Sequence, residues 1–303
     1  MSEIVDRAVR ILRDGGVVAF PTETVYGLGA DATNASAVAR VFQIKGRPST
    51  NPLIVHVADE QSARRYASEF PVAATKLVAR FWPGPLTIVL PKAPAIVSSV
   101  TAGLDTVGLR APNHPLALEL LRAFDGALAG PSANQSTHVS PTTAQHVRDE
   151  LGDAVDLVLD GGPCAVGIES TVLSLVGQPT IFRLGAITRE MIEEVIHQHI
   201  SASDTVAEAT SPARSPGQLA VHYAPRTPAF RFDPRERDRI DLTDAAIIEP
   251  TLDAETYARN FYARLRMLDA QQLRAIYIEM PPNAPLWAAV RDRIVRGTKP
   301  LDP

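Results

Sequence analysis

The feature that most restricts the fold is a succession of short elements between residues 17 and 57. Val17–Phe20 is an apolar run after two glycines, which predicts a buried strand. Leu53–Val57 predicts a second strand. Between them, Asn34 is a suitable N-cap for a helix in which Val38 and Val41 share a face. Strand, helix and strand in this order predict an α/β fold.

Polar groups follow the first predicted strand. Pro21–Thr24 brings hydroxyls and backbone amides to the carboxyl end of the strand, the place where open α/β sheets bind ligands. A surface turn is the more frequent explanation for such a tetrapeptide alone. Gly27-Leu28-Gly29 predicts a bend. It lacks the third glycine and the following helix of a dinucleotide-binding fingerprint, so we reject that assignment.

Two cations and a histidine follow. Lys45-Gly46-Arg47-Pro48 ends the helix at a proline-fixed corner that suits a phosphate, although solvated cations at a helix end are equally common. Arg110 ends a predicted strand, Thr106–Arg110, and suits a carboxylate or a surface ion pair. His56 lies on the face of its strand opposite Val55 and Val57; taken alone, it is more often structural than a ligand contact.

Through the rest of the first two hundred residues, predicted strands and helices alternate irregularly, which predicts a mixed rather than an all-parallel sheet. Small residues in Gly130–Asn134 would let a ligand approach the backbone closely, and Ser140 or Thr142 could cap the next helix. Strands are expected at 86–90, 106–110, 127–129, 157–159 and 180–183, and helices at 73–81, 116–124 and 189–199.

The composition changes to Ser, Ala, Thr and Pro over residues 201–228, which marks a linker. Beyond it, strands at 245–248 and 275–278 and helices through Tyr257–Leu268 and Leu286–Val295 predict a small α/β domain. We therefore expect a large domain at 1–204, a linker or lid at 205–228, and a small domain at 229–303.

Composition excludes several classes of protein. The formal charge of −4 argues against tight, sequence-independent binding of nucleic acid over a wide surface. Cys164 is the only cysteine among 303 residues, so no intrachain disulfide and no cysteine-based zinc site can form. No apolar run is long enough to cross a bilayer, and we expect a cytoplasmic protein that does not bind membranes.

Seven blocks in the same order resemble the L-threonylcarbamoyladenylate synthase family, in its two-domain form with a YrdC-like catalytic domain. They are PTETVYGLGADA, KGRPSTNPLIVHV, FWPGPLTIVL, VGLRAPNHP, PSAN with SPTTAQHV, GIESTV, and the linker sequence SPG…HYAP. The resemblance is close over residues 1–228. It implies a twisted, open, mixed α/β sheet around a positively lined cavity, with a second, smaller α/β domain.

The resemblance also implies an activity. The family's nucleotidyltransferases convert L-threonine, bicarbonate or CO₂, and ATP into threonylcarbamoyl-AMP and pyrophosphate. The product serves the modification of tRNA to threonylcarbamoyladenosine. The implied partners are the downstream tRNA enzymes, with weak tRNA contact as a further expectation.

Site residues follow from the matched motifs. Lys45 and Arg47 are the implied catalytic residues. The implied L-threonine contacts are Thr24, His56, Arg110, Gly130 and Ser170. The implied ATP contacts are Arg47, Asn51, Thr106, Ser132, Ser140, Arg183 and Tyr223.

The chemistry needs no covalent enzyme nucleophile, and the residues offer no convincing Ser-His-Asp set. We expect positioning and charge neutralisation of the departing pyrophosphate, with Mg²⁺ held mainly by ATP phosphates and no dedicated metal site. Because carbamates revert to amine and CO₂ in water, we expect the linker to cover the cavity through Tyr223.

Two other functions share this fold. A non-catalytic RNA-binding or ribosome-associated protein would need a cationic face with exposed aromatics, which the acidic total does not favour. A carbamoyl transferase of the hydrogenase-maturation kind carries a cysteine zinc set, which a single cysteine excludes.

Overall fold

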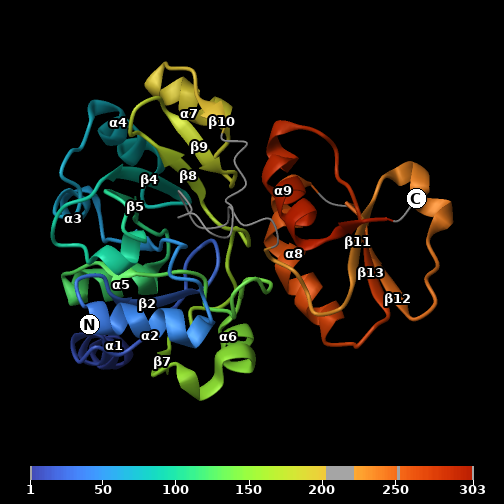
Figure 1. Ribbon diagram of the computed structural model, residues 1–303, viewed down its shortest axis with the longest axis horizontal. Coiled ribbons are helices and arrows are strands. Elements are labelled where there is room, and N and C mark those ends of the chain that lie inside the picture. Colours follow the sequence, from blue (N-terminus) through green and yellow to red (C-terminus); the bar gives the residue numbers. More distant parts are fainter. Residues whose placement is uncertain (1, 203–221, 251–252, 302–303) are drawn as a thin grey trace.

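The computed structural model describes residues 2–202, 222–250 and 253–301 (Figure 1). They form a larger N-terminal unit and a smaller C-terminal unit. The predicted linker begins at 205, and its residues 205–221 lie outside the described ranges.

In chain order, the helices and strands of the larger unit are α1 (Glu3–Arg13), β1 (Val18–Phe20), β2 (Gly27–Asp31), α2 (Ala35–Lys45), β3 (Ile54–His56), α3 (Glu60–Arg64), α4 (Val72–Phe81), β4 (Leu86–Pro91), η1 (Ser98–Thr101), β5 (Thr106–Arg110), α5 (Pro115–Phe124), β6 (Leu128–Ala129), α6 (Ala144–Leu151), η2 (Gly152–Ala154), β7 (Leu157–Val158), β8 (Thr171–Ser174), β9 (Thr180–Arg183), α7 (Arg189–Ile196) and β10 (Ser201–Ala202).

The larger unit is built on one mixed sheet. Over the described residues, its ten strands run in the order β10-β9-β8-β4-β5-β3-β6-β2-β1-β7. Strand β3 is parallel to β5, with His56 opposite Arg110, and antiparallel to β6. Strand β4 is antiparallel to β5 and parallel to β8. This arrangement confirms the predicted mixed sheet.

Helices pack on both faces of this sheet. On one face, α1 and α5 bury apolar residues such as Val5, Leu12 and Leu120 against Phe20. On the other face, α2, α4, α6 and α7 cover a larger core. Each fully buried Val or Leu contributes about 1.5–3 kcal/mol, so these apolar faces hold the helices in place. In the described part of the chain, no helix is long and apolar enough to cross a membrane.

The predicted bend at Gly27-Leu28-Gly29 is wrong, because these residues form strand β2 beside β1. The glycines are required by packing: a Cβ atom on Gly27 or Gly29 would lie 2.8 Å from the Phe20 ring. The rejection of a dinucleotide-binding turn agrees with this geometry, since β2 pairs antiparallel with its neighbour and no helix follows Gly29 directly.

One of the two predicted helix caps is confirmed, at Asn34. The Asn34 side chain accepts hydrogen bonds from the backbone at the start of α2, and Thr188 caps α7. The expected cap of α6 by Ser140 or Thr142 is wrong: Thr143 caps it by accepting from the His146 backbone N–H at 3.2 Å. This frees the Ser140 hydroxyl for another contact.

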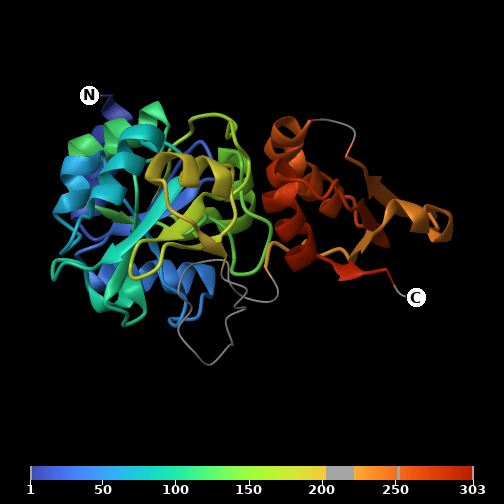
Figure 2. The same ribbon diagram turned by 90° about the horizontal axis from the view of Figure 1, so that it is seen from above.

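The smaller unit has its own parallel sheet. In chain order, its elements are β11 (Ala229–Phe232), η3 (Pro234–Arg239), β12 (Ala245–Ile248), α8 (Ala254–Asp269), β13 (Ala275–Glu279), η4 (Pro285–Trp287), α9 (Ala288–Gly297) and β14 (Lys299–Pro300). Its described strands run in the order β12-β13-β11-β14. Helices α8 and α9 lie on the side of this sheet that faces the larger unit (Figures 1 and 2).

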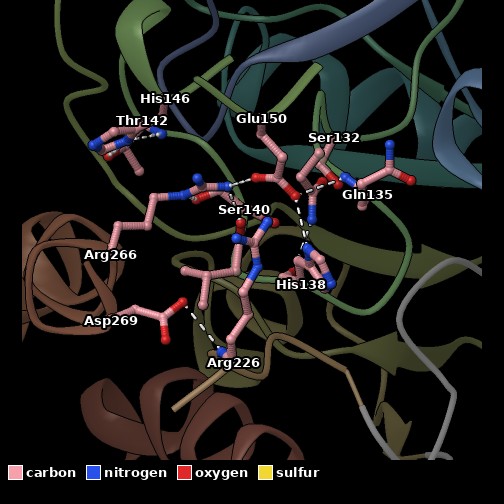
Figure 3. A network of polar contacts seen from close by, with 12 residues as sticks. Ser132, Gln135, His138, Ser140, Thr142, His146, Glu150, Arg226, Arg266 and Asp269 are labelled. Atoms are coloured by element: carbon pink, nitrogen blue, oxygen red, sulfur yellow. Dashed lines mark hydrogen bonds and ion pairs between the residues drawn. The ribbon is translucent and has the colours of Figure 1, made fainter. Parts of the chain in front are cut away.

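The two units share an apolar core and polar contacts. Val139 and Ile168 of the larger unit pack in the same cluster as Phe261 and Ile294. Gly167 touches α8 so closely that a Cβ atom would lie 2.4 Å from the Arg259 carbonyl oxygen. Arg266 reaches from α8 to the Glu150 carboxylate and to backbone oxygens of the larger unit (Figure 3).

Candidate functional site

A cavity lies at the edge of the larger sheet where β3 and β5 end, and it encloses about 520 Å³ including its open mouth. Most residues predicted to bind a ligand meet there. The cavity is lined by Thr22, Thr24, Val25, Gly27, Arg47, Ile54, His56, Arg110, Gly130, Pro131, Ser132, Glu169, Ser170, Arg183, His222 and Tyr223.

Arg110 is fixed on three sides at the end of β5. Its Nε donates to the Gly84 carbonyl at 3.2 Å, and one Nη donates to the Thr24 hydroxyl at 2.9 Å. The other Nη lies 2.7 Å from a Glu23 carboxylate oxygen, and both side chains are buried. Because of these contacts the guanidinium is preorganised, so binding an anion would cost little side-chain entropy.

Arg47 occupies the corner after α2. Its guanidinium donates to the carbonyls of Asn51 (3.2 Å) and Pro52 (2.9 Å), and the residue is buried. Burial lowers the pKa of Arg47 to about 10, with a further reduction from Arg183. It therefore remains a cation at neutral pH and favours a negatively charged ligand.

Lys45, an implied catalytic residue, is bound to the backbone of a neighbouring loop. Its ammonium group is fully buried and donates to the backbone carbonyls of Ser132 (2.6 Å) and Asn134. Burial and the nearby Arg47 lower its pKa well below the ordinary value. Lys45 does not line the cavity; it fixes the loop that places Ser132 on the cavity wall.

Arg183 and Ser170 form another part of the wall. Arg183 donates from Nε to the Ser170 carbonyl and from Nη to the Ser170 hydroxyl, each at 3.0 Å. Thr87 lies within hydrogen-bond distance of the same hydroxyl, at 2.8 Å. Burial lowers the pKa of Arg183. Ser170 is thus held rigidly at the entry to β8.

His56 projects into the cavity. Its ring makes an edge contact with Phe20, with centroids 5.3 Å apart. Burial and repulsion from Arg110 lower the pKa of His56 to about 3, so the imidazole is neutral at physiological pH. A Cβ atom on Gly130 would lie 3.0 Å from His56 Nδ1, and the absence of a side chain there keeps the imidazole accessible.

Glu169, His222 and Thr22 were not assigned from the sequence although they line the cavity. Glu169 lies inside the GIESTV block and His222 beside the predicted Tyr223, so both could have been found as polar residues within a recognised motif. Thr22 hydrogen-bonds to Thr24 at 2.8 Å through the two hydroxyls.

Four predicted residues lie outside the lining. Asn51 is buried beside Arg47, and Ser140 is buried behind Glu169, to which its hydroxyl donates at 2.6 Å. Thr106 lines a neighbouring pocket of about 320 Å³ that shares Ile54 with the main cavity. Lys45 supports the loop described above.

Unpartnered polar atoms are concentrated around this cavity. Within the described residues, the His56 Nδ1, the His222 Nδ1, the Tyr223 hydroxyl and both polar atoms of the Asn51 side chain are buried without a hydrogen-bond partner. Such atoms each cost roughly 1–3 kcal/mol unless a ligand or water satisfies them. Their clustering identifies the cavity as the candidate binding site.

A resident metal site is not evident in the described ranges, where no cluster of three His, Cys, Asp or Glu side chains could hold an ion. The carboxylate nearest to the cavity, Glu169, already accepts hydrogen bonds from Ser140, Tyr262 and Arg293. The donors of this cavity suit anionic oxygens.

Models of known protein families match both units of the chain. Residues 10–185 match the family of Sua5, YciO and YrdC, described as "Telomere recombination". Residues 187–298 match the family described as "Threonylcarbamoyl-AMP synthase, C-terminal domain".

Individual relatives match over nearly the whole chain. A protein of Bacillus subtilis named threonylcarbamoyl-AMP synthase is 47% identical, and the match covers 96% of this chain and 92% of the relative. A protein of the same name from Pyrococcus abyssi is 37% identical, and the match covers 96% of this chain and 93% of the relative. The crystal structure of P. abyssi Sua5 complexed with L-threonine superposes with a TM-score of 0.90, at 36% identity, covering 97% of this chain and 95% of that one.

Proposed function

Because the chain belongs to the Sua5, YciO and YrdC family in its two-domain form, we propose that it is a threonylcarbamoyl-AMP synthase. In this reaction L-threonine, bicarbonate or CO₂, and ATP give threonylcarbamoyl-AMP and pyrophosphate. The enzyme is then a nucleotidyltransferase, since it transfers an adenylyl group to a carbamate.

The main support for this proposal is that Arg47, Arg110 and Arg183 are buried around one cavity. The buried polar atoms without a hydrogen-bond partner described above surround the same cavity. Buried cations are costly unless they are paired, and the carboxylates near them are Glu23 and Glu169. The phosphates of ATP and the carboxylate of an amino acid are the anionic groups that guanidinium donors bind best.

The proposed L-threonine subsite is formed by Thr24, His56, Arg110, Gly130 and Ser170. Arg110 suits the threonine carboxylate because its guanidinium is already oriented by Thr24 and Glu23. The neutral His56 ring leaves Nδ1 available for a hydrogen bond with the substrate.

The proposed ATP subsite is formed by Arg47, Asn51, Thr106, Ser132, Ser140, Arg183 and Tyr223. Arg47 and Arg183 suit phosphate oxygens, and the pocket at Thr106 adjoins the cavity through Ile54. Tyr223 closes one side of the cavity, where it would limit the access of water to the carbamate.

The chemistry requires two bond-forming steps. The threonine amine adds to CO₂ and loses a proton, which gives a carbamate. A carbamate oxygen then attacks the α-phosphorus, and the bond to pyrophosphate breaks. Arg47 would stabilise charge on the departing pyrophosphate, and Lys45 would serve by fixing the Ser132 loop.

We also propose that Mg²⁺ enters with ATP and is held mainly by the phosphates. The donor set fits this arrangement, because guanidinium groups and hydroxyls surround the cavity and its carboxylate Glu169 is already paired. When bound, Mg²⁺ would neutralise phosphate charge. Chelation with EDTA should therefore abolish turnover while L-threonine binding persists.

The proposed test is release of pyrophosphate from ATP, measured with L-threonine, with bicarbonate, with both and with neither, and with the adenylate identified by mass. Release that needs both co-substrates is expected. ATP hydrolysis independent of threonine would contradict the proposal. Salt-sensitive RNA binding without ATP turnover would instead favour the RNA-binding alternative.

We propose that the product passes to downstream enzymes that modify tRNA and that the reaction takes place in the cytoplasm. Because the formal charge of the chain is −4, any direct contact with tRNA is expected to be weak.

A further inference from the structure

Glu169 connects the cavity to the C-terminal unit. One carboxylate oxygen accepts a hydrogen bond from the Ser140 hydroxyl at 2.6 Å. The other accepts from the Tyr262 hydroxyl and from Arg293 Nε, each at 2.9 Å. Glu169 lines the cavity, whereas Tyr262 lies in α8 and Arg293 in α9. The C-terminal unit therefore holds a residue of the cavity wall directly.

Arg293 is fully buried, and each of its three guanidinium nitrogens has a partner. Besides Glu169, it contacts the Asp292 carboxylate at 2.7 Å and donates to the Leu184 carbonyl at 2.8 Å. Its guanidinium carbon also lies 5.1 Å from the centre of the Tyr223 ring. A buried arginine with this many directed contacts holds its partners in one geometry.

The charge state of Glu169 agrees with this pairing. Burial alone would raise its pKa, but Arg293, Arg183 and the Ser140 hydroxyl lower it to about 2. Glu169 is therefore ionised at any physiological pH and can only accept hydrogen bonds. Since the single hydroxyl proton of Ser140 is directed at Glu169, Ser140 can offer a ligand only its oxygen lone pairs.

Two neighbours of Glu169 belong to the proposed subsites: Ser170 follows it in the chain, and Ser140 binds its carboxylate. Ser170, the next residue, is held by Arg183. Ser140 is held a second time from the C-terminal unit, because Arg266 donates to its carbonyl oxygen at 3.3 Å (Figure 3). Displacing Glu169 would thus move a residue of each proposed subsite.

We propose that Arg293 and Tyr262 are positioning residues for the reaction: they fix Glu169, and through it Ser140 and Ser170, so that docking of the C-terminal unit completes the active site. The inference rests on the proposed function. It assigns the C-terminal unit a specific part in catalysis at the cavity wall.

The test compares Tyr262→Phe and Arg293→Met with Arg259→Gln. The first removes a single hydroxyl from a fully buried ring and is expected to fold. The control removes another hydrogen bond across the same interface, from Arg259 to the Ala165 carbonyl, at an exposed position that does not line the cavity. Steady-state pyrophosphate release, the KM for L-threonine and the thermal unfolding temperature are measured for each.

We expect Tyr262→Phe to lower kcat about 10-fold and to raise the KM for L-threonine, because a hydrogen bond to a charged group is lost. Arg293→Met should lower kcat further. Arg259→Gln should match the wild type. If Tyr262→Phe and Arg293→Met retain the wild-type kcat and KM and only unfold at lower temperature, the contacts are structural and the inference is wrong.

A double-mutant cycle identifies Glu169 as the intermediary. Adding Arg293→Met to Glu169→Gln should cost less in kcat than adding it to the wild type, because the two side chains act as one unit. Additive losses would contradict the proposal. A wild-type protein without threonine-dependent pyrophosphate release would refute the proposed function itself, and this result is distinguishable from the other two.

Discussion

At the residue scale, the cavity works through cations that are fixed before any ligand arrives. The guanidinium groups of Arg47, Arg110 and Arg183 each donate to a backbone carbonyl. The sequence predicted Arg110 and Arg47 as anion-binding residues because a strand end and a proline corner fix their backbone. It could not show that the Lys45 ammonium is bound by backbone carbonyls, because these carbonyls belong to residues 87 and 89 positions away in the chain.

Arg47→Ala should remove stabilisation of the departing pyrophosphate. The loss of about 3 kcal/mol of transition-state stabilisation should lower kcat/KM roughly 100-fold. Arg47→Lys should recover little of this, since an ammonium cannot form the same forked contact. Arg40→Ala is the matched control: Arg40 lies on α2, the helix that precedes Arg47, and its partly exposed side chain pairs with Asp156. An Arg47→Ala enzyme as active as the control would refute the assigned role.

The buried histidines predict how stability depends on pH. The pKa values of His56 and His222 are lowered by burial from 6.5 to about 3, whereas in the unfolded chain they are near 6.5. Between these values the unfolded state binds more protons, so the free energy of unfolding should fall as the pH is lowered from 6.5 toward 3.

Each histidine adds up to about 1.4 kcal/mol per pH unit to that slope. Urea denaturation at several pH values would measure it, and His56→Gln should reduce it. An equal slope in the wild type and the variant would mean that His56 is not buried in its neutral form.

At the scale of elements, close backbone contacts set the position of the cavity wall. Gly185 follows β9 and touches the backbone at the start of β8: a Cβ atom there would lie 2.2 Å from the Thr171 nitrogen and 2.5 Å from the Ser170 carbonyl carbon. The sequence predicted strand 180–183 correctly. It did not predict β8. The helix predicted at 189–199 is too long: α7 ends at Ile196, because His197 adopts a left-handed conformation (φ 54°). Such terminations depend on local backbone geometry that residue types alone do not fix.

Gly185→Ala should therefore force β9 away from Ser170 and destabilise the fold by about 3 kcal/mol, because backbone atoms cannot rotate out of the way. Ala186→Ser, at the exposed next position, is the control. Chemical denaturation and the KM for L-threonine would check both variants. Wild-type stability in Gly185→Ala would show that the strands are spaced more loosely than described.

At the scale of the whole molecule, the C-terminal unit holds a residue of the cavity wall, because Tyr262 and Arg293 both bind Glu169. The sequence predicted two α/β units from local periodicity, and the structure has two sheets. The strand order of the larger sheet could not be predicted, because each pairing joins segments distant in the chain. Nor could the role of Arg293: within RDRIVRG it resembles a solvated helix face, and its partner Glu169 lies 124 residues earlier.

The proposed reaction requires that one cavity holds an amino acid and a nucleotide side by side. A crystal structure of the protein with L-threonine and a non-hydrolysable ATP analogue tests it most directly. We expect the threonine carboxylate at Arg110 and the triphosphate at Arg47 and Arg183, within the same cavity. Ligands bound in separate, unconnected pockets would contradict it.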